Sequence, residues 1–105
     1  MSTLDTQQRF DVLDTQQQLF AITAEECGEL TQVCMKILRK AKLWSHVDDQ
    51  QNKRLLEEVG DVYCMLDLIV QHGYLSWDSI IDRSNVKKQK LKTWSNLINV
   101  EDKTA

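Results

Sequence analysis

Residues 19–41 read LFAITAEECGELTQVCMKILRKA, and within this stretch apolar residues return every three or four positions. That spacing places them on one side of a helix, so we expect a long amphipathic α-helix over about 14–41. The alternative start is Thr23, because residues 23–26 also match a capping box. The stripe is predicted to consist of Phe20, Thr23, Cys27, Leu30, Cys34, Ile37 and Ala41, widened by Leu19, Ile22 and Val33.

Two further helices are expected downstream. Apolar residues at helical spacing predict the second over about 53–71, with Gly73 closing it. The polar stretch 42–52, which contains Trp44 and His46, is read as a loop. Ser76 is the expected N-cap of the third helix, which carries Ile80, Ile81, Val86, Leu91 and Trp94, with a break near 83–85 left open.

No segment alternates polar and apolar residues as a strand does, so the predicted fold is all-α. The 105 residues allow one domain, an antiparallel helical bundle with polar tails at about 1–13 and 99–105. Proline is absent and glycine occurs three times, a composition that favours long helices. The wide apolar stripes predict that a second copy of the chain completes the bundle.

Composition also narrows the functional classes. The formal net charge of −3 argues against a protein whose main partner is nucleic acid. No run approaches the roughly 20 apolar residues of a membrane span, and the N-terminus does not resemble a signal peptide. Cys27, Cys34 and Cys64 form no CxxC pair and are expected to be reduced, partly buried thiols. A cytoplasmic location follows as the expectation.

The most informative feature is the placement of the acids. Glu26 and Glu29 lie about 60° apart on the first helix, and Glu58 and Asp61 repeat this relation on the second. Both pairs lie beside apolar residues, at the edge of the surface expected to pack. Two like charges 4 Å apart repel by about 4 kcal/mol at an effective dielectric of 20, so a packed acidic cluster needs a cation. Periodicity alone leaves two interpretations open, acids on solvated faces and a site for a hard divalent ion.

Glycine lies between the acids of each pair, at Gly28 and Gly60. Glycine inside a helix costs about 1 kcal/mol relative to alanine. We expect the small residues to let the two helices approach closely.

The stretches 24–30 (AEECGEL) and 56–62 (LEEVGDV) contain EExxE and ExxD patterns, separated by 28 residues (30–57). This pairing resembles the signature of the MazG-type nucleoside triphosphate pyrophosphohydrolases. The run Lys87-x-x-Lys90-Leu91-x-x-Trp94-Ser95 is similar to the C-terminal stretch of small, phage-type members. The likeness covers about residues 17–97, and the gap between the two motifs is long for the family.

The resemblance implies an oligomeric hydrolase that uses Mg²⁺, or Mn²⁺ in its place, to cleave nucleoside triphosphates between the α and β phosphates. Glu26, Glu29, Glu58 and Asp61 match the metal ligands, and Glu25 matches the position of the base that activates water. The partners implied are the triphosphate substrate and further copies, as a homodimer or homotetramer, in the cytoplasm of the cell or of a phage host.

Cations at helical spacing from the acids are candidates for binding the substrate. Lys36 lies seven residues beyond Glu29, and Arg54 lies one turn before Glu58. Lys40 lies one turn beyond Lys36, and Lys87 and Lys90 form a separate i,i+3 pair. Lysines at such spacing also occur on purely solvated faces.

Three alternatives stay open at this point. The enzyme could be a base-selective relative of the dimeric dUTPase or dCTPase type. It could be a relative of phosphoribosyl-ATP pyrophosphohydrolase. A catalytically silent helical interaction module is the alternative outside the enzymes. A di-iron carboxylate bundle is rejected, because neither His46 nor His72 follows a glutamate by three residues.

Overall fold

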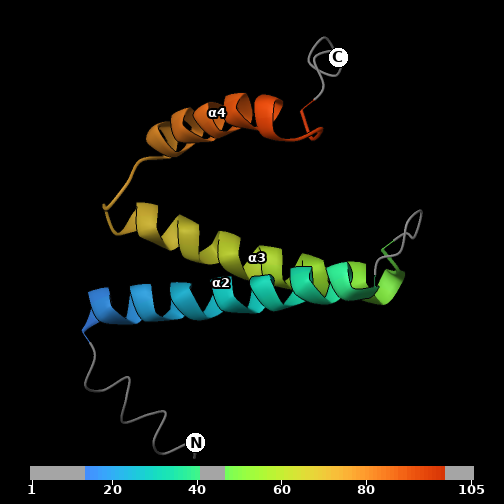
Figure 1. Ribbon diagram of the computed structural model, residues 1–105. Helices are drawn as coiled ribbons and strands as arrows, with labels where there is room; N and C mark the ends of the chain where they lie inside the picture. The colour runs from blue at the N-terminus through green and yellow to red at the C-terminus, as the bar shows by residue number, and fades with distance from the viewer. Residues whose placement is uncertain (1–13, 41–46, 99–105) are drawn as a thin grey trace, which may run out of the picture. The chain divides into compact units, whose positions relative to one another are not determined.

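The computed structural model describes residues 14–40 and 47–98 and places three helices there. These are α2 (Thr15–Lys40), α3 (Asp49–Gln71) and α4 (Trp77–Trp94) (Figure 1). The described ranges contain no strand, which confirms the all-α class. Within the same ranges, no helix has the length and apolar character needed to cross a bilayer. The predicted tails, Trp44 and His46 lie outside the described residues.

Helix α2 begins with a reciprocal cap rather than at Thr23. The Gln17 amide donates to the Asp14 carboxylate over 2.8 Å, and the Asp14 amide donates to the Gln17 side chain over 3.0 Å. This arrangement satisfies backbone donors that would otherwise lack a partner at the helix start. Thr23 lies inside the helix, where its hydroxyl donates to the Leu19 carbonyl over 2.7 Å. The alternative start at Thr23 is therefore wrong.

Helix α3 begins at Asp49, earlier than the predicted start near Lys53. The reason is a second reciprocal cap, in which the Gln51 amide donates to the Asp48 carboxylate over 2.7 Å. The Asp48 amide donates in return to the Gln51 side chain over 3.2 Å. At the other end, Gly73 has a φ of +83°, the left-handed conformation predicted to close this helix.

Helix α4 starts at the predicted N-cap. The Ser79 amide donates to the Ser76 hydroxyl over 3.2 Å. The helix continues through residues 83–85 to Trp94, so the break considered there is wrong. Ser95 ends it by donating its amide and its hydroxyl to the Leu91 carbonyl.

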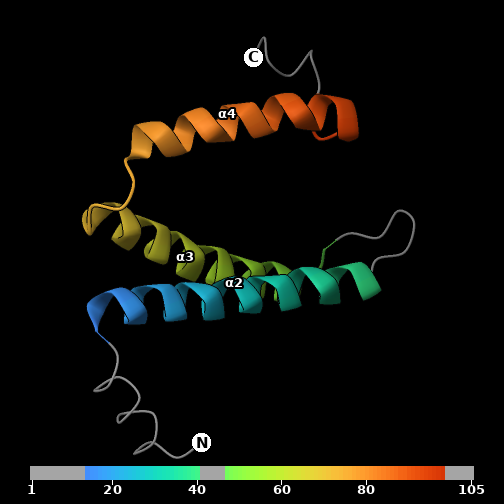
Figure 2. The ribbon, with the colours of Figure 1, turned by 60° about the vertical axis from the view of Figure 1, so that its left-hand side comes forward.

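The described helices divide between two compact units, one containing α2 and α3 and the other containing α4. In the first unit α2 and α3 run antiparallel and side by side as a hairpin, as both views show (Figures 1 and 2). Leu19, Met65 and Ile69 form its buried cluster, with Ile22 and Leu68 packed against it.

The buried face of α2 differs from the predicted stripe. Leu19 and Val33, expected only to widen the stripe, are buried, whereas Phe20, Cys27 and Cys34 are exposed. The packed face is therefore rotated toward the acids and away from the thiols. Cys64 is also exposed, so the expectation of partly buried cysteines is wrong.

The glycines do not act as predicted. A Cβ atom built at Gly28 or at Gly60 would meet no neighbouring atom within 4 Å. Close approach of the helices therefore does not depend on either glycine.

Candidate metal centre

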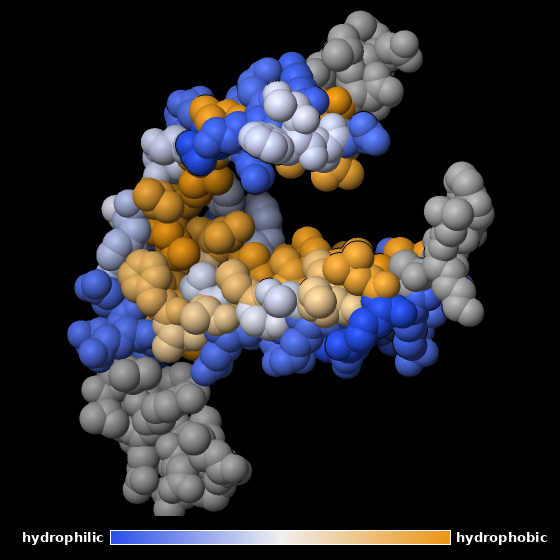
Figure 3. All heavy atoms as spheres, viewed as in Figure 1, coloured by the Kyte–Doolittle hydropathy of each residue, from blue (hydrophilic) through white to orange (hydrophobic). Residues whose placement is uncertain are grey.

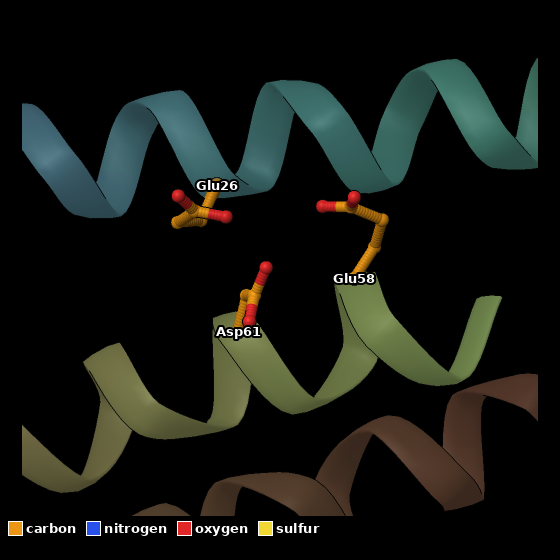
Figure 4. Close-up of side chains that lie close together, drawn as sticks. All are labelled: Glu26, Glu58 and Asp61. Atoms are coloured by element: carbon orange, nitrogen blue, oxygen red, sulfur yellow. The ribbon is translucent and has the colours of Figure 1, made fainter. Parts of the chain in front are cut away.

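Three acids from the two helices of the hairpin converge in the space between them (Figure 4). Glu26 comes from α2, and Glu58 and Asp61 come from adjacent turns of α3. One carboxylate oxygen of each residue lies within 4.8 Å of the corresponding oxygens of the other two. Ionised carboxylates only accept hydrogen bonds, so they cannot hold one another together by hydrogen bonding. The arrangement suits a cation placed among the oxygens.

Glu58 is the buried member of this cluster, with only 6% of its surface exposed. Its Oε1 forms an ion pair with the guanidinium of the half-exposed Arg54 at 3.2 Å. Its Oε2 is buried and has no hydrogen-bond partner. A buried polar atom without a partner costs about 1–3 kcal/mol, and more if it is charged. A metal ion bound to Oε2 would remove this cost, and Figure 4 shows the carboxylate directed toward α2.

Glu26 is half-buried, and its pKa is raised above the ordinary value of 4.5. Burial is the largest cause, because it disfavours the charged form. The negative charges of Asp61 and Glu58 raise this pKa further, followed by those of Glu29 and Glu25. A divalent cation among these acids would reverse the effect, since it favours ionised carboxylates.

Three of the four predicted ligands therefore lie together. Glu29 is exposed and is not among the three that converge, although its charge contributes to the raised pKa of Glu26. Its role as a ligand stays a prediction. Glu25, the predicted base, is an exposed neighbour of Glu26 on α2.

The predicted substrate-binding cations separate into two groups. Lys36 and Arg54 line a hollow of about 260 Å³ between the C-terminal turns of α2 and the N-terminal turns of α3. Lys87 and Lys90 lie exposed on α4, in the other compact unit. The other described residues that line the hollow are Val33, Ile37, Lys40, Asp48, Gln50 and Gln51.

Sequence reasoning missed the contribution of Asp48, Gln50 and Gln51, because it assigned them to the loop. The signal that could have placed them is an aspartate followed by glutamine three residues later, ahead of the apolar run of α3. The same pattern, Asp14 and Gln17, precedes α2.

The donors of the cluster are all carboxylate oxygens, with no histidine or cysteine among them. Hard ions such as Mg²⁺ and Ca²⁺ prefer oxygen ligands, and Mg²⁺ typically binds through one or two protein carboxylates and completes its shell with water and substrate phosphates. Comparison with protein-family models, curated proteins and solved structures gave no match to this chain.

Proposed function

We propose that this chain is a Mg²⁺-dependent nucleoside triphosphate pyrophosphohydrolase of the MazG type. The observation that carries the proposal is the buried, unpartnered Oε2 of Glu58 inside a cluster with Glu26 and Asp61. Acids on purely solvated faces would not leave such an atom buried. The order and spacing of the EExxE and ExxD motifs supply the reaction class.

Glu26, Glu58 and Asp61 would hold the metal, with Glu29 as a further ligand from α2. When bound, Mg²⁺ neutralises phosphate charge and makes the α-phosphorus more open to attack. The residues of the chain do the remaining work by fixing the phosphates in one orientation relative to the attacking water.

Glu25 is the proposed general base, on the exposed side of α2 next to Glu26. It accepts a proton from water as the water oxygen bonds to the α-phosphorus. The bond from that phosphorus to the α–β bridging oxygen breaks, and this oxygen leaves with pyrophosphate. The products are a nucleoside monophosphate and pyrophosphate.

Cations would complete the site. Arg54 already contacts Glu58, so it lies where it can also meet a phosphate oxygen. Lys36 extends the positive charge along α2. Lys87 and Lys90 on α4 remain proposed phosphate contacts.

Selectivity for one base, as in dUTPase or dCTPase relatives, and action on phosphoribosyl-ATP are variants of this same reaction. A silent helical module is the competing class, and the buried Oε2 of Glu58 argues against it, since a scaffold gains nothing from a buried oxygen without a partner.

The test is to incubate the protein with Mg²⁺ and a panel of ribo- and deoxyribonucleoside triphosphates that includes phosphoribosyl-ATP. We expect monophosphate and pyrophosphate in equal amounts from at least one substrate, and no product in excess chelator. Release of diphosphate and orthophosphate, or full activity in chelator, would contradict the proposal.

A further inference from the structure

The hollow between α2 and α3 contains an unusual density of positive charge. Lys36 and Lys40 reach it from α2, and Arg54 reaches it from α3. Among the described residues, Asp48 is the one acid that lines it, and its carboxylate accepts the Gln51 amide as a helix cap. Within the described residues, neither Lys36 nor Lys40 is paired with an acid. Arg54 is paired with Glu58 and the Asp48 carboxylate is engaged as a cap, which leaves the two lysines as the unpaired charges of these residues.

Gln51 adds an unused donor to the same hollow. Its Oε1 accepts from the Asp48 amide, whereas its Nε2 is buried and has no partner. A buried N–H donor without an acceptor is costly, so an acceptor atom of a ligand would be favoured there. The hollow also lies at the N-terminus of α3, where the helix dipole favours negative charge.

The hollow is small for a whole nucleotide. Pockets for drug-sized ligands measure about 300–1,000 Å³, and this one measures about 260 Å³. Among the described residues that line it, none is an aromatic side chain on which a base could stack. Lysine and arginine are instead suited to phosphate oxygens.

The hollow and the acidic cluster both lie along α3. Gln51 precedes Glu58 by seven residues, about 10 Å along α3 at 1.5 Å per residue. Arg54 lies between them, contacts Glu58 and lines the hollow. Arg54 thus connects the hollow with the acidic cluster along α3.

We infer that this hollow is the subsite for the terminal phosphates, the part of the substrate that leaves as pyrophosphate. Lys36 and Lys40 bind its oxygens from one side, and Gln51 Nε2 donates to them from the other. The assignment to a leaving group rests on the proposed function, whereas the binding of a pyrophosphate anion by these residues does not.

The test is equilibrium dialysis of the full chain against labelled inorganic pyrophosphate, with Mg²⁺ present. We expect the Lys36→Met/Lys40→Met variant to bind at least about tenfold more weakly than the wild type, because charged hydrogen bonds of this kind are lost. Methionine retains the apolar stem, so folding should be kept. The control Lys53→Met/Lys88→Met removes two exposed charges outside the hollow and should bind as the wild type does. Lys36→Arg/Lys40→Arg should restore binding.

Equal affinity in the Lys36→Met/Lys40→Met variant and the control would overturn the inference, as would a wild type that does not bind pyrophosphate. The Mg²⁺-induced rise in melting temperature separates the two proposals, because it depends on the acids and should be unchanged in the lysine variant. Lysine-dependent binding of pyrophosphate without any Mg²⁺ shift or triphosphate cleavage would support the hollow and contradict the proposed function.

Discussion

Glu58 lies on the same face of α3 as Met65 and Ile69, at positions seven and eleven residues before these core side chains. An apolar residue would ordinarily fill such a position, because burying a carboxylate is costly without full hydrogen bonding. The acid therefore reduces the stability of the metal-free hairpin. We take that cost as support for the proposed metal site.

Replacing this acid tests its role directly. Glu58→Gln keeps the shape of the side chain and removes one negative charge, so we expect activity to fall by roughly 100-fold or more. Loss of a residue that only hydrogen-bonds to a metal ligand typically lowers activity by about 10–100-fold, and loss of a ligand should lower it at least as much. The metal-free variant should melt at a higher temperature than the wild type, because a like charge has gone. Thermal melts with and without Mg²⁺ should show a smaller metal-induced shift in the variant.

Glu57→Gln is the matched control, an exposed acid in the same motif that is not one of the three converging residues. It should behave as the wild type does. A Glu58→Gln variant that retains activity and the full Mg²⁺ shift would remove Glu58 from the site.

The raised pKa of Glu26 predicts how stability and Mg²⁺ binding depend on pH. Its pKa is raised in the folded state, so between the ordinary value of 4.5 and the raised value the folded protein binds more protons than the unfolded chain. The contribution of Glu26 to metal-free stability is thus present below 4.5 and lost as the pH rises through the folded value. Mg²⁺ requires the ionised form, so its affinity should fall as the pH decreases through that same range.

Calorimetric titration of Mg²⁺ at several pH values measures this dependence. Glu26→Gln should weaken binding and flatten the pH profile. An affinity for Mg²⁺ that does not change as the pH falls toward 4.5 would contradict the account of Glu26.

At the scale of the helix, the start of α3 depends on Asp48. Asp48→Ala removes the acceptor for the Gln51 amide, and loss of such a cap typically costs about 1 kcal/mol. We expect urea denaturation followed by circular dichroism to show a destabilisation of that size. Asp48→Asn keeps an equally good cap and should be close to neutral. Equal stability of the alanine and asparagine variants would show that the cap does not hold this end of α3.

The helices were predictable from sequence because their signals are local. Apolar spacing, Gly73 and Ser76 specify where they run, and the capping pairs specify where α2 and α3 begin. The buried face of α2 was not predictable in the same way. Phe20 and Cys27 are more apolar than Glu26, yet Glu26 faces α3 and they are exposed. Which face packs depends on the partner helix, which periodicity within one helix cannot supply.

The candidate site likewise combines features that follow from one helix with features that depend on how α2 and α3 pack. The i,i+3 relation of Glu58 and Asp61 is a property of one helix, so sequence predicted that they share a patch. That Glu26 rather than Glu29 meets them depends on the register between α2 and α3. The burial of Glu58 and the donor left by Gln51 also arise only when the hairpin closes.

At the scale of the whole molecule, the hairpin leaves large apolar side chains uncovered. Leu56, Val59 and Tyr63 follow one face of α3 at i, i+3 and i+7, and Leu56 is 71% exposed. Figure 3 shows hydrophobic residues gathered over the α3 side of the hairpin. Tyr63 is also exposed in the single chain. Uncovered apolar stripes of this kind favour association with another copy.

We therefore expect at least a dimer at micromolar concentration, measured by light scattering coupled to size-exclusion chromatography. Leu56→Lys should shift the population toward monomer, because it places a charge in the proposed interface. Gln32→Lys, which places the same charge at an exposed polar position of α2, should not. A wild type that stays at the 12.2 kDa of one chain would contradict the prediction.

The most direct test of the central claim follows the oxygen of the attacking water. The protein is incubated with Mg²⁺ and a nucleoside triphosphate that it hydrolyses, in water enriched in ¹⁸O. The products are analysed by mass spectrometry. Attack at the α-phosphorus predicts one ¹⁸O atom in the nucleoside monophosphate and none in pyrophosphate, with roughly 100-fold less product, or lower still, for Glu58→Gln. Label in pyrophosphate, or products other than these two, would contradict it.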